Sequence, residues 1–121
     1  MMRPPDLPEQ HKTVFGIRRD HELVGLLDVL RGYPDPDVVY IGLLQIRRDL
    51  QRQGLTRDAH QALLTLIHEW PEVRRLRLAI VATNSQVEPF WRGLGYAPVG
   101  LPVPYTYNHL VTTAQRFERI V

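Results

Sequence analysis

Two hydrophobic periodicities follow one another along this chain and predict the order of its secondary-structure elements. Segments 14–18, 23–31 and 38–46 are rich in Val, Leu, Ile and Tyr, which is typical of β-strands. Asp20, His21 and Glu22 separate the first two segments, and a turn-rich stretch at 32–37 separates the second from the third. Because short turns favour antiparallel pairing, the first third of the chain is expected to form a three-stranded meander.

The period changes at residue 55, where apolar residues begin to recur every three or four positions up to Trp70. This spacing is typical of an amphipathic helix, and Pro71 should end it. An apolar run at 76–82 then predicts a central strand. A strand, a helix and a strand in series require a right-handed crossover and a parallel pair of strands.

A second helix is expected at 86–94, with Gly95 as its left-handed C-terminal cap. Residues 96–99 and 110–120 are expected to be the last strands, joined by a loop at 100–108 that is rich in Pro and Tyr. The predicted fold class is α/β (α+β): a mixed, mostly antiparallel sheet of about six strands, with a central parallel βαβ pair and two main helices.

The length of 121 residues suits one domain, expected at 12–121 after an N-terminal tail or linker at 1–11. No apolar stretch approaches the roughly 18 residues of a membrane span, and no secretory signal follows Met1. The chain has no cysteine, which excludes disulfides, a thiolate nucleophile and a thiolate metal site. A cytoplasmic location is expected.

The charge pattern is weakly basic, with a formal net charge of +2 and Lys12 as the sole lysine. The arginines are scattered and interrupted by acids, so they form no basic stripe with interleaved aromatic residues of the kind that binds nucleic acid. His60 and His68 share the first helix but are too far apart in sequence to share a metal ion. We expect neither a nucleic-acid partner nor a metal site.

The loop at 51–56 carries the strongest chemical signal. It contains Gly54 and joins an apolar strand to the start of a helix, where several backbone N–H groups are free and the helix dipole is positive. Arg52 and Arg57 add positive charge nearby. Such a site suits phosphate, although an ordinary strand-to-helix turn would also use a glycine for its dihedral angles.

The sequence resembles the GNAT N-acetyltransferase superfamily, whose acyl-CoA signature is Q/R-x-x-G-x-G/A. Here the signature reads Gln51-Arg52-Gln53-Gly54-Leu55-Thr56, between a strand and a helix. A second hallmark follows: an Asn after the next strand, here Asn84, and then an aromatic ending, Phe90-Trp91-Arg92-Gly93-Leu94-Gly95-Tyr96. The resemblance covers about residues 13 to 120 and implies acetyl-CoA as co-substrate.

The resemblance implies a cofactor-binding role for eleven residues. The backbone of Gln51, Arg52, Gln53, Gly54, Leu55 and Thr56 would wrap the pyrophosphate, and Leu44, Gln45 and Ile46 would pair with the pantetheine arm as an added strand. Asn84 would bond that arm, unless it only caps the second helix beside a Ser85–Glu88 capping box. Trp91 would contact the ligand or belong to the core.

The chain departs from the family pattern where protons move. Thr56 replaces the small Gly or Ala that ends the signature. Trp91 stands where many relatives have a tyrosine that protonates the leaving thiolate, and an indole N–H cannot serve as that acid at neutral pH. Tyr40 occupies the strand position where histone-type relatives have a glutamate that acts as the base. Asp28, inside an apolar strand, is either paired with a strand-end arginine or solvated, or else binds the acceptor amine. Tyr40 and Asp28 are the catalytic candidates.

Family members usually begin with a strand and two helices that build much of the acceptor pocket, and only about a dozen residues precede the first strand here. Either the gene start is truncated, or a partner subunit supplies the missing wall, or this copy has lost acceptor chemistry. The leading hypothesis is transfer of an acetyl group directly to a primary amine of a small molecule or peptide. The alternative is a non-catalytic acyl-CoA-binding or oligomerisation module with a degenerate acceptor site, and a third possibility is a domain without a ligand. Because the first strand lies at an uncovered sheet edge, a homodimer is expected.

Overall fold

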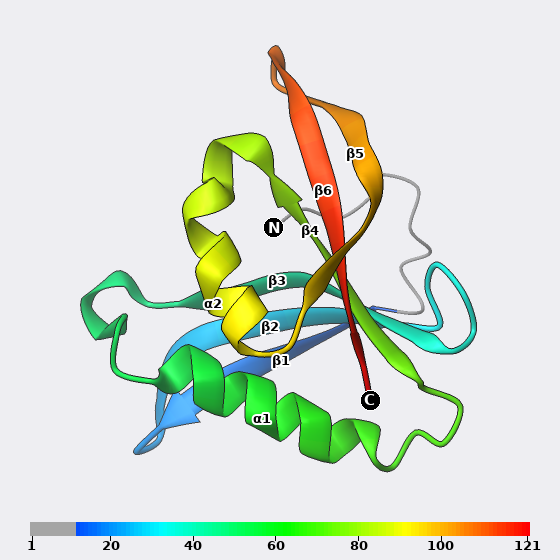
Figure 1. Cartoon of the computed structure of the whole chain (residues 1–121). Coiled ribbons are helices and arrows are strands. Elements are labelled where there is room, and N and C mark those ends of the chain that lie inside the picture. Colours follow the sequence, from blue (N-terminus) through cyan, green and yellow to red (C-terminus); the bar gives the residue numbers. More distant parts are fainter. Residues whose placement is uncertain (1–11) are drawn as a thin grey trace.

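The computed structural model describes residues 12–121, so the predicted tail at 1–11 lies outside the described residues. Figure 1 shows a strongly twisted sheet with helices packed against it. The elements, in chain order, are β1 (Lys12–Arg19), β2 (Glu22–Arg31), β3 (Val38–Ile46), the 3₁₀ turn η2 (Arg48–Leu50), α1 (Leu55–Ile67), β4 (Arg75–Val81), the 3₁₀ segment η3 (Ala82–Val87), α2 (Glu88–Gly93), β5 (Ala97–Tyr107) and β6 (Leu110–Ile120).

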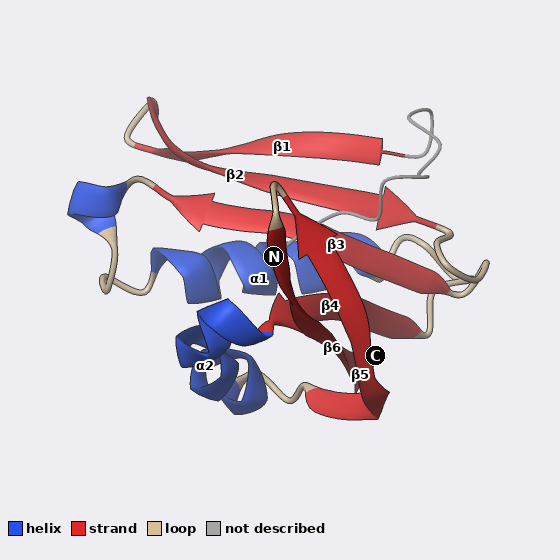
Figure 2. Ribbon diagram, turned by 90° about the horizontal axis from the view of Figure 1, so that it is seen from above, coloured by secondary structure: helices blue, strands red, loops and turns tan. Residues whose placement is uncertain are grey.

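The sheet has six strands in the order β1-β2-β3-β4-β6-β5. Strands β1, β2 and β3 form the expected antiparallel meander, and β3 pairs with β4 in parallel through the α1 crossover. The β5–β6 hairpin completes the sheet on the far side of β4 and extends away from the body of the molecule (Figures 1 and 2). The predicted mixed, mostly antiparallel fold is therefore confirmed.

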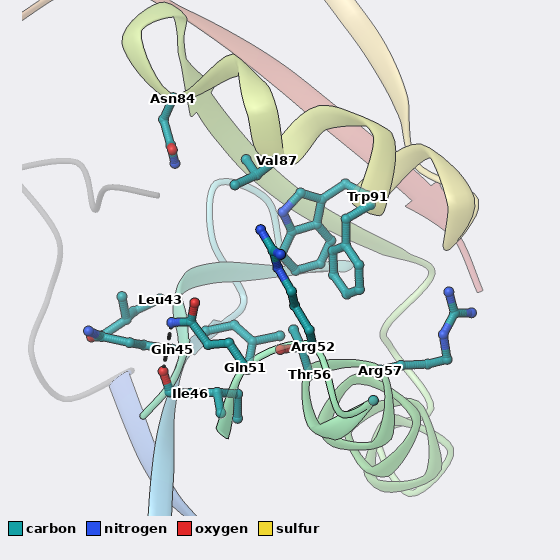
Figure 3. Close-up of a pocket in the computed structure, with 13 residues that line it drawn as sticks. Leu43, Gln45, Ile46, Gln51, Arg52, Thr56, Arg57, Asn84, Val87 and Trp91 are labelled. Carbon is teal, nitrogen blue, oxygen red and sulfur yellow. Dashed lines mark hydrogen bonds between the residues drawn. The ribbon is translucent and has the colours of Figure 1, made fainter. Parts of the chain in front are cut away.

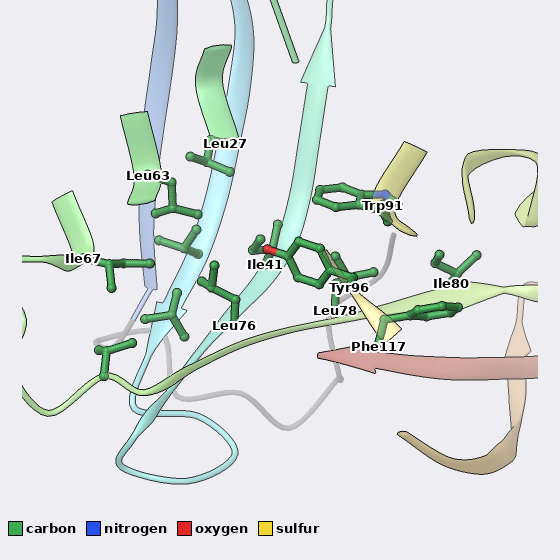
Figure 4. Packing of buried hydrophobic residues seen from close by; sticks show 13 residues of the cluster. Leu27, Ile41, Leu63, Ile67, Leu76, Leu78, Ile80, Trp91, Tyr96 and Phe117 are labelled. Carbon is green, nitrogen blue, oxygen red and sulfur yellow. The ribbon is translucent and has the colours of Figure 1, made fainter. Parts of the chain in front are cut away.

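One hydrophobic cluster joins both helices to the same face of the sheet (Figure 4). Leu63 and Ile67 of α1 pack with inward-facing residues of β2, β3 and β4, as their three- and four-residue spacing requires. Trp91 of α2 belongs to the same cluster, with Phe117 of β6. Since α1 and α2 share this core, their positions relative to β3 are fixed by packing.

The expected loop at 100–108 was wrong. β5 continues through this region to Tyr107 and breaks register only between Val99 and Val103. Pro98, Pro102 and Pro104 are tolerated because β5 is an edge strand, where a missing N–H can face away from the ladder. The sequence analysis predicted a loop here because prolines are common in turns and loops.

The segment expected to be one helix at 86–94 is also different. A 3₁₀ segment, η3, precedes α2, and Asn84 within it has non-helical angles (φ −122°, ψ 30°). No side chain caps either segment, so the capping box expected from Ser85 and Glu88 does not form. The first helix is shorter than its pattern, since α1 ends at Ile67 rather than at Trp70.

Candidate functional site

The site begins where β3 and β4 separate. Among residues 12–121, the parallel ladder joins only Val38, Val39 and Tyr40 to β4. Beyond it, Gly42 is an extra residue in β3, because Asp28 pairs with Leu43 whereas Val29 pairs with Ile41. A β-bulge of this kind bends its strand, and here it lies where β3 turns away from β4. Residues 43–46 pair with β2 on one side, and on the side toward β4 their backbone therefore faces an opening.

The loop that follows β3 turns back toward this opening. Arg52 (φ 67°) and Gly54 (φ 81°) both have left-handed backbone angles, which glycine adopts without strain. The Gln51 side-chain amide donates to the Ile46 carbonyl at 3.1 Å and so fixes the loop to the end of β3 (Figure 3). Gly54 is the N-cap of α1 and supplies no side-chain cap, so the first N–H groups of α1 lack a side-chain partner.

These features form one wall of a pocket of about 600 Å³. Figure 3 shows lining side chains that come from β3, from the loop with the first turn of α1, and from η3 with α2. The lining residues are Leu43, Leu44, Gln45, Ile46, Gln51, Arg52, Gly54, Thr56, Arg57, Asn84, Val87, Phe90 and Trp91. The pocket is thus polar and cationic beside the loop and apolar beside α2.

Two cations of the pocket are available to an anion. Within residues 12–121, neither Arg52 nor Arg57 forms an ion pair with an acidic side chain. By contrast, Arg47 at the end of β3 is held by Asp49 and Glu22. Two guanidinium groups with no acidic partner in this part of the chain, beside an uncapped helix N-terminus, form an arrangement that favours a phosphate-bearing ligand.

The opposite wall is mostly aromatic. Trp91 is buried and contacts Phe90 edge to face, with ring centroids 5.2 Å apart. Asn84 also reaches the pocket, and its Oδ1 accepts a hydrogen bond from the Gln86 side chain. Asn84 retains its amide N–H donors, so it is able to bond a ligand carbonyl.

Most of the predicted cofactor-binding residues lie together. All of them line this pocket except Gln53, whose side chain accepts a 2.8 Å hydrogen bond from Arg19, and Leu55, which packs beside Ile46 and Leu50. Backbone contacts of Gln53 and Leu55 with a ligand stay a prediction. The sequence analysis did not assign Leu43, Val87 and Phe90 to the site. Val87 and Phe90 share a helical face with Trp91, which was the available signal.

The two catalytic candidates are not among the residues that line the pocket. Burial raises the pKa of the Tyr40 phenol to about 12, so this side chain keeps its proton at neutral pH. Asp28 forms an ion pair with Lys12 at 3.2 Å, so the strand-end cation seen beside it is a lysine. Tyr40 lies in β3 within its short ladder to β4, whereas Asp28 lies in β2, on the other side of β3 from the opening. Their catalytic roles stay predictions.

Among residues 12–121, no three His, Asp or Glu side chains lie close enough together to hold a metal ion. The expectation of no metal site stays a prediction. No helix in the described part is long and apolar enough to cross a membrane.

Similar folds are found among solved acetyltransferase structures. An acetyltransferase from Thermus thermophilus has a TM-score of 0.75 and 26% sequence identity; the match covers 92% of this chain but only 65% of that one. An acetyltransferase from Salmonella typhimurium that modifies the N-terminal serine of ribosomal protein L7/L12 has a TM-score of 0.80 and 21% identity, with 93% and 66% covered. A GNAT family acetyltransferase from Elizabethkingia anophelis with bound acetyl-CoA has a TM-score of 0.75 and 10% identity, with 93% and 78% covered.

Comparison with curated proteins gave no match. The sequence model of the acetyltransferase (GNAT) family, however, matches residues 2–96, which is most of the chain and includes every residue of the pocket. The chain therefore belongs to the GNAT acetyltransferase family.

Proposed function

We propose that this protein binds acetyl-CoA in the pocket between β3, the 51–56 loop and α2, and transfers the acetyl group to a primary amine of a small molecule or peptide. The observation that carries the proposal is the uncapped start of α1 beside Arg52 and Arg57, facing the open edge of β3. Bound acetyl-CoA in the structural neighbour from E. anophelis supports the same ligand.

Each wall has a part in holding the ligand. Backbone N–H groups of the loop and of the first turn of α1 would bind the pyrophosphate, and the guanidinium groups of Arg52 and Arg57 would neutralise its charge. The open edge of β3 at Leu44, Gln45 and Ile46 would pair with the amides of the pantetheine arm, as an added strand would.

The chemistry needs no covalent intermediate. The amine nitrogen attacks the thioester carbon, the C–S bond breaks, and the nitrogen loses a proton. A backbone N–H of Leu44 or Ile46 would stabilise the oxyanion. Trp91 has no acidic proton to give, so the leaving thiolate would take its proton from water.

A second function is a module that binds acyl-CoA without turning it over. It is favoured by one observation: within residues 12–121, the side chains that line the pocket include no Asp, Glu, His, Cys or Tyr that could transfer a proton at neutral pH. Both functions require binding, and only the first requires release of CoA when an amine is present.

The experiment combines calorimetry of acetyl-CoA binding with a thiol-release assay on a panel of amines. Gly54→Val should abolish binding, because a β-branched residue at φ 81° strains the loop and adds bulk beside the phosphate site. Gly32→Val is the matched control, since Gly32 has φ 83° and an equally open surrounding but lies in the β2–β3 loop. Binding that survives Gly54→Val would refute the site, and wild-type binding without turnover would favour the module.

The quaternary structure is a separate proposal. Among the described strands β1 is an edge of the sheet, with an uncharged centre at residues 13–17, whereas the other edge, β5, is protected by three prolines. We propose that β1 pairs with a second copy to form a homodimer. Light scattering that shows a monomer at tens of micromolar would contradict it. The cytoplasmic location and the absence of a nucleic-acid partner stay predictions.

A further inference from the structure

A buried polar contact joins two walls of the pocket without lining it. Nε2 of His60 on α1 and the hydroxyl of Tyr96, just after α2, are 2.8 Å apart and share a hydrogen bond. His60 and Tyr96 are each only 2% exposed. A hydrogen bond inside an apolar core is costly to break, because either partner alone is then left unsatisfied.

The bond links the elements that carry the ligand-binding groups. His60 lies one turn beyond Thr56 and Arg57, so it moves with the first turn of α1 and with the preceding 51–56 loop, which we call the phosphate loop. Tyr96 is bound to α2 through its backbone N–H, which donates to the Trp91 carbonyl at 3.1 Å. Trp91 in turn lines the pocket.

Aromatic packing makes this connection stiff. The ring of His60 contacts Tyr96 (centroids 5.5 Å apart) and Trp91 (6.0 Å), and Tyr96 contacts Trp91 at 5.2 Å, all close to edge to face. Figure 4 shows Tyr96 and Trp91 within the buried cluster. Burial lowers the pKa of His60 to about 4, so at neutral pH the imidazole is uncharged and suited to this position.

We propose that His60 and Tyr96 are positioning residues that hold the phosphate-loop wall and the α2 wall at the separation that CoA requires. The proposal rests on the proposed function, because it assumes that CoA spans both walls. A ligand that binds through two linked ends gains affinity only if both subsites are correctly spaced. Loss of the His60–Tyr96 hydrogen bond should therefore weaken the binding of whole CoA far more than the binding of either half of it.

The test compares three probes by calorimetry: CoA, adenosine 3′,5′-diphosphate for the loop wall, and pantetheine for the β3–α2 wall. Tyr96→Phe, which removes only the hydroxyl, and His60→Leu should each weaken CoA binding by about tenfold or more. The affinity gained by binding both ends of one ligand at the correct spacing is then lost. The dissociation constant of each fragment should change by less than about threefold. His60→Gln keeps an acceptor for the Tyr96 hydroxyl and should recover most of the affinity.

Controls separate this role from general destabilisation. Tyr107→Phe changes a tyrosine that is 56% exposed on the β5–β6 hairpin, and it should bind all three probes as the wild type does. Each variant is checked by circular dichroism at the assay temperature. Equal weakening of CoA and both fragments, or unchanged CoA affinity in Tyr96→Phe, would overturn the positioning role. Failure of the wild type to bind CoA would overturn the proposed function itself and, with it, this inference.

Discussion

The buried histidine of α1 predicts a pH dependence of folding that no exposed histidine would give. Burial is the main reason that the pKa of His60 falls from its ordinary 6.5 to about 4, and the positive charges of Arg119 and Arg57 lower it further. Between pH 6.5 and 4 the unfolded chain takes up a proton at His60 that the native state does not. The free energy of unfolding must therefore decrease as the pH falls through this window.

The size of the effect follows from the two pKa values. Each pKa unit corresponds to 1.36 kcal/mol, so a depression from 6.5 to about 4 amounts to about 3 kcal/mol at full effect. Between pH 7 and pH 4.5 the loss should be about 2.5 kcal/mol, because His60 is then almost fully protonated in the unfolded chain and mostly neutral in the native state. This is a large part of the stability of an ordinary domain of this size.

Urea unfolding at pH 7 and at pH 4.5 measures the loss. In His60→Gln, which cannot titrate, the difference between the two pH values should shrink by about 2.5 kcal/mol. His68→Gln makes the same substitution at an exposed histidine just beyond the end of the same helix and is the matched control. Asp37, Asp49 and Glu72, whose pKa values are lowered by arginine partners, contribute equally to all three proteins. The same pH difference in His60→Gln as in the wild type would refute the reasoning.

Three other substitutions test separate features. Glu118→Gln weakens the partly buried pair with Arg77 and should lower the free energy of unfolding by about 2–3 kcal/mol in urea; a loss below about 0.5 kcal/mol would show that the pair is solvated. Val14→Asp on β1 should convert the proposed dimer to monomer in light scattering, whereas Val111→Asp, on an exposed valine of β6, should not. If the Tyr40 hydroxyl moves a proton, Tyr40→Phe should lower kcat by about 10²-fold at unchanged acetyl-CoA affinity, and an unchanged kcat would remove it from the chemistry.

Local patterns in the sequence were sufficient for most of the fold. The meander and the parallel βαβ unit follow from strand-like runs, short turns and the three- and four-residue spacing of α1, and each is present. The failures occurred where local chemistry and tertiary position disagree. The prolines of β5 indicate a loop when read alone, but an edge position makes them compatible with a strand.

The candidate site divides in the same way. By itself the sequence predicted a loop that suits phosphate, because Gly54, the preceding strand and the following helix are contiguous, and backbone N–H groups at a helix start point the same way in any such loop. It also placed Asn84 and Trp91 in the order that the family requires. Only the folded structure shows that Asn84 and Trp91 line one pocket together with β3.

Only the tertiary structure decided which distant side chains became partners. The pairing of Asp28 with Lys12, the burial of Tyr40 and the contact between His60 and Tyr96 all join residues from different elements. No periodicity carries such information, because it depends on the twist of the sheet and on how α1 and α2 pack against it. The sequence thus determined most of the elements and predicted the loop that suits phosphate, and packing determined the shape, charge and rigidity of the pocket around them.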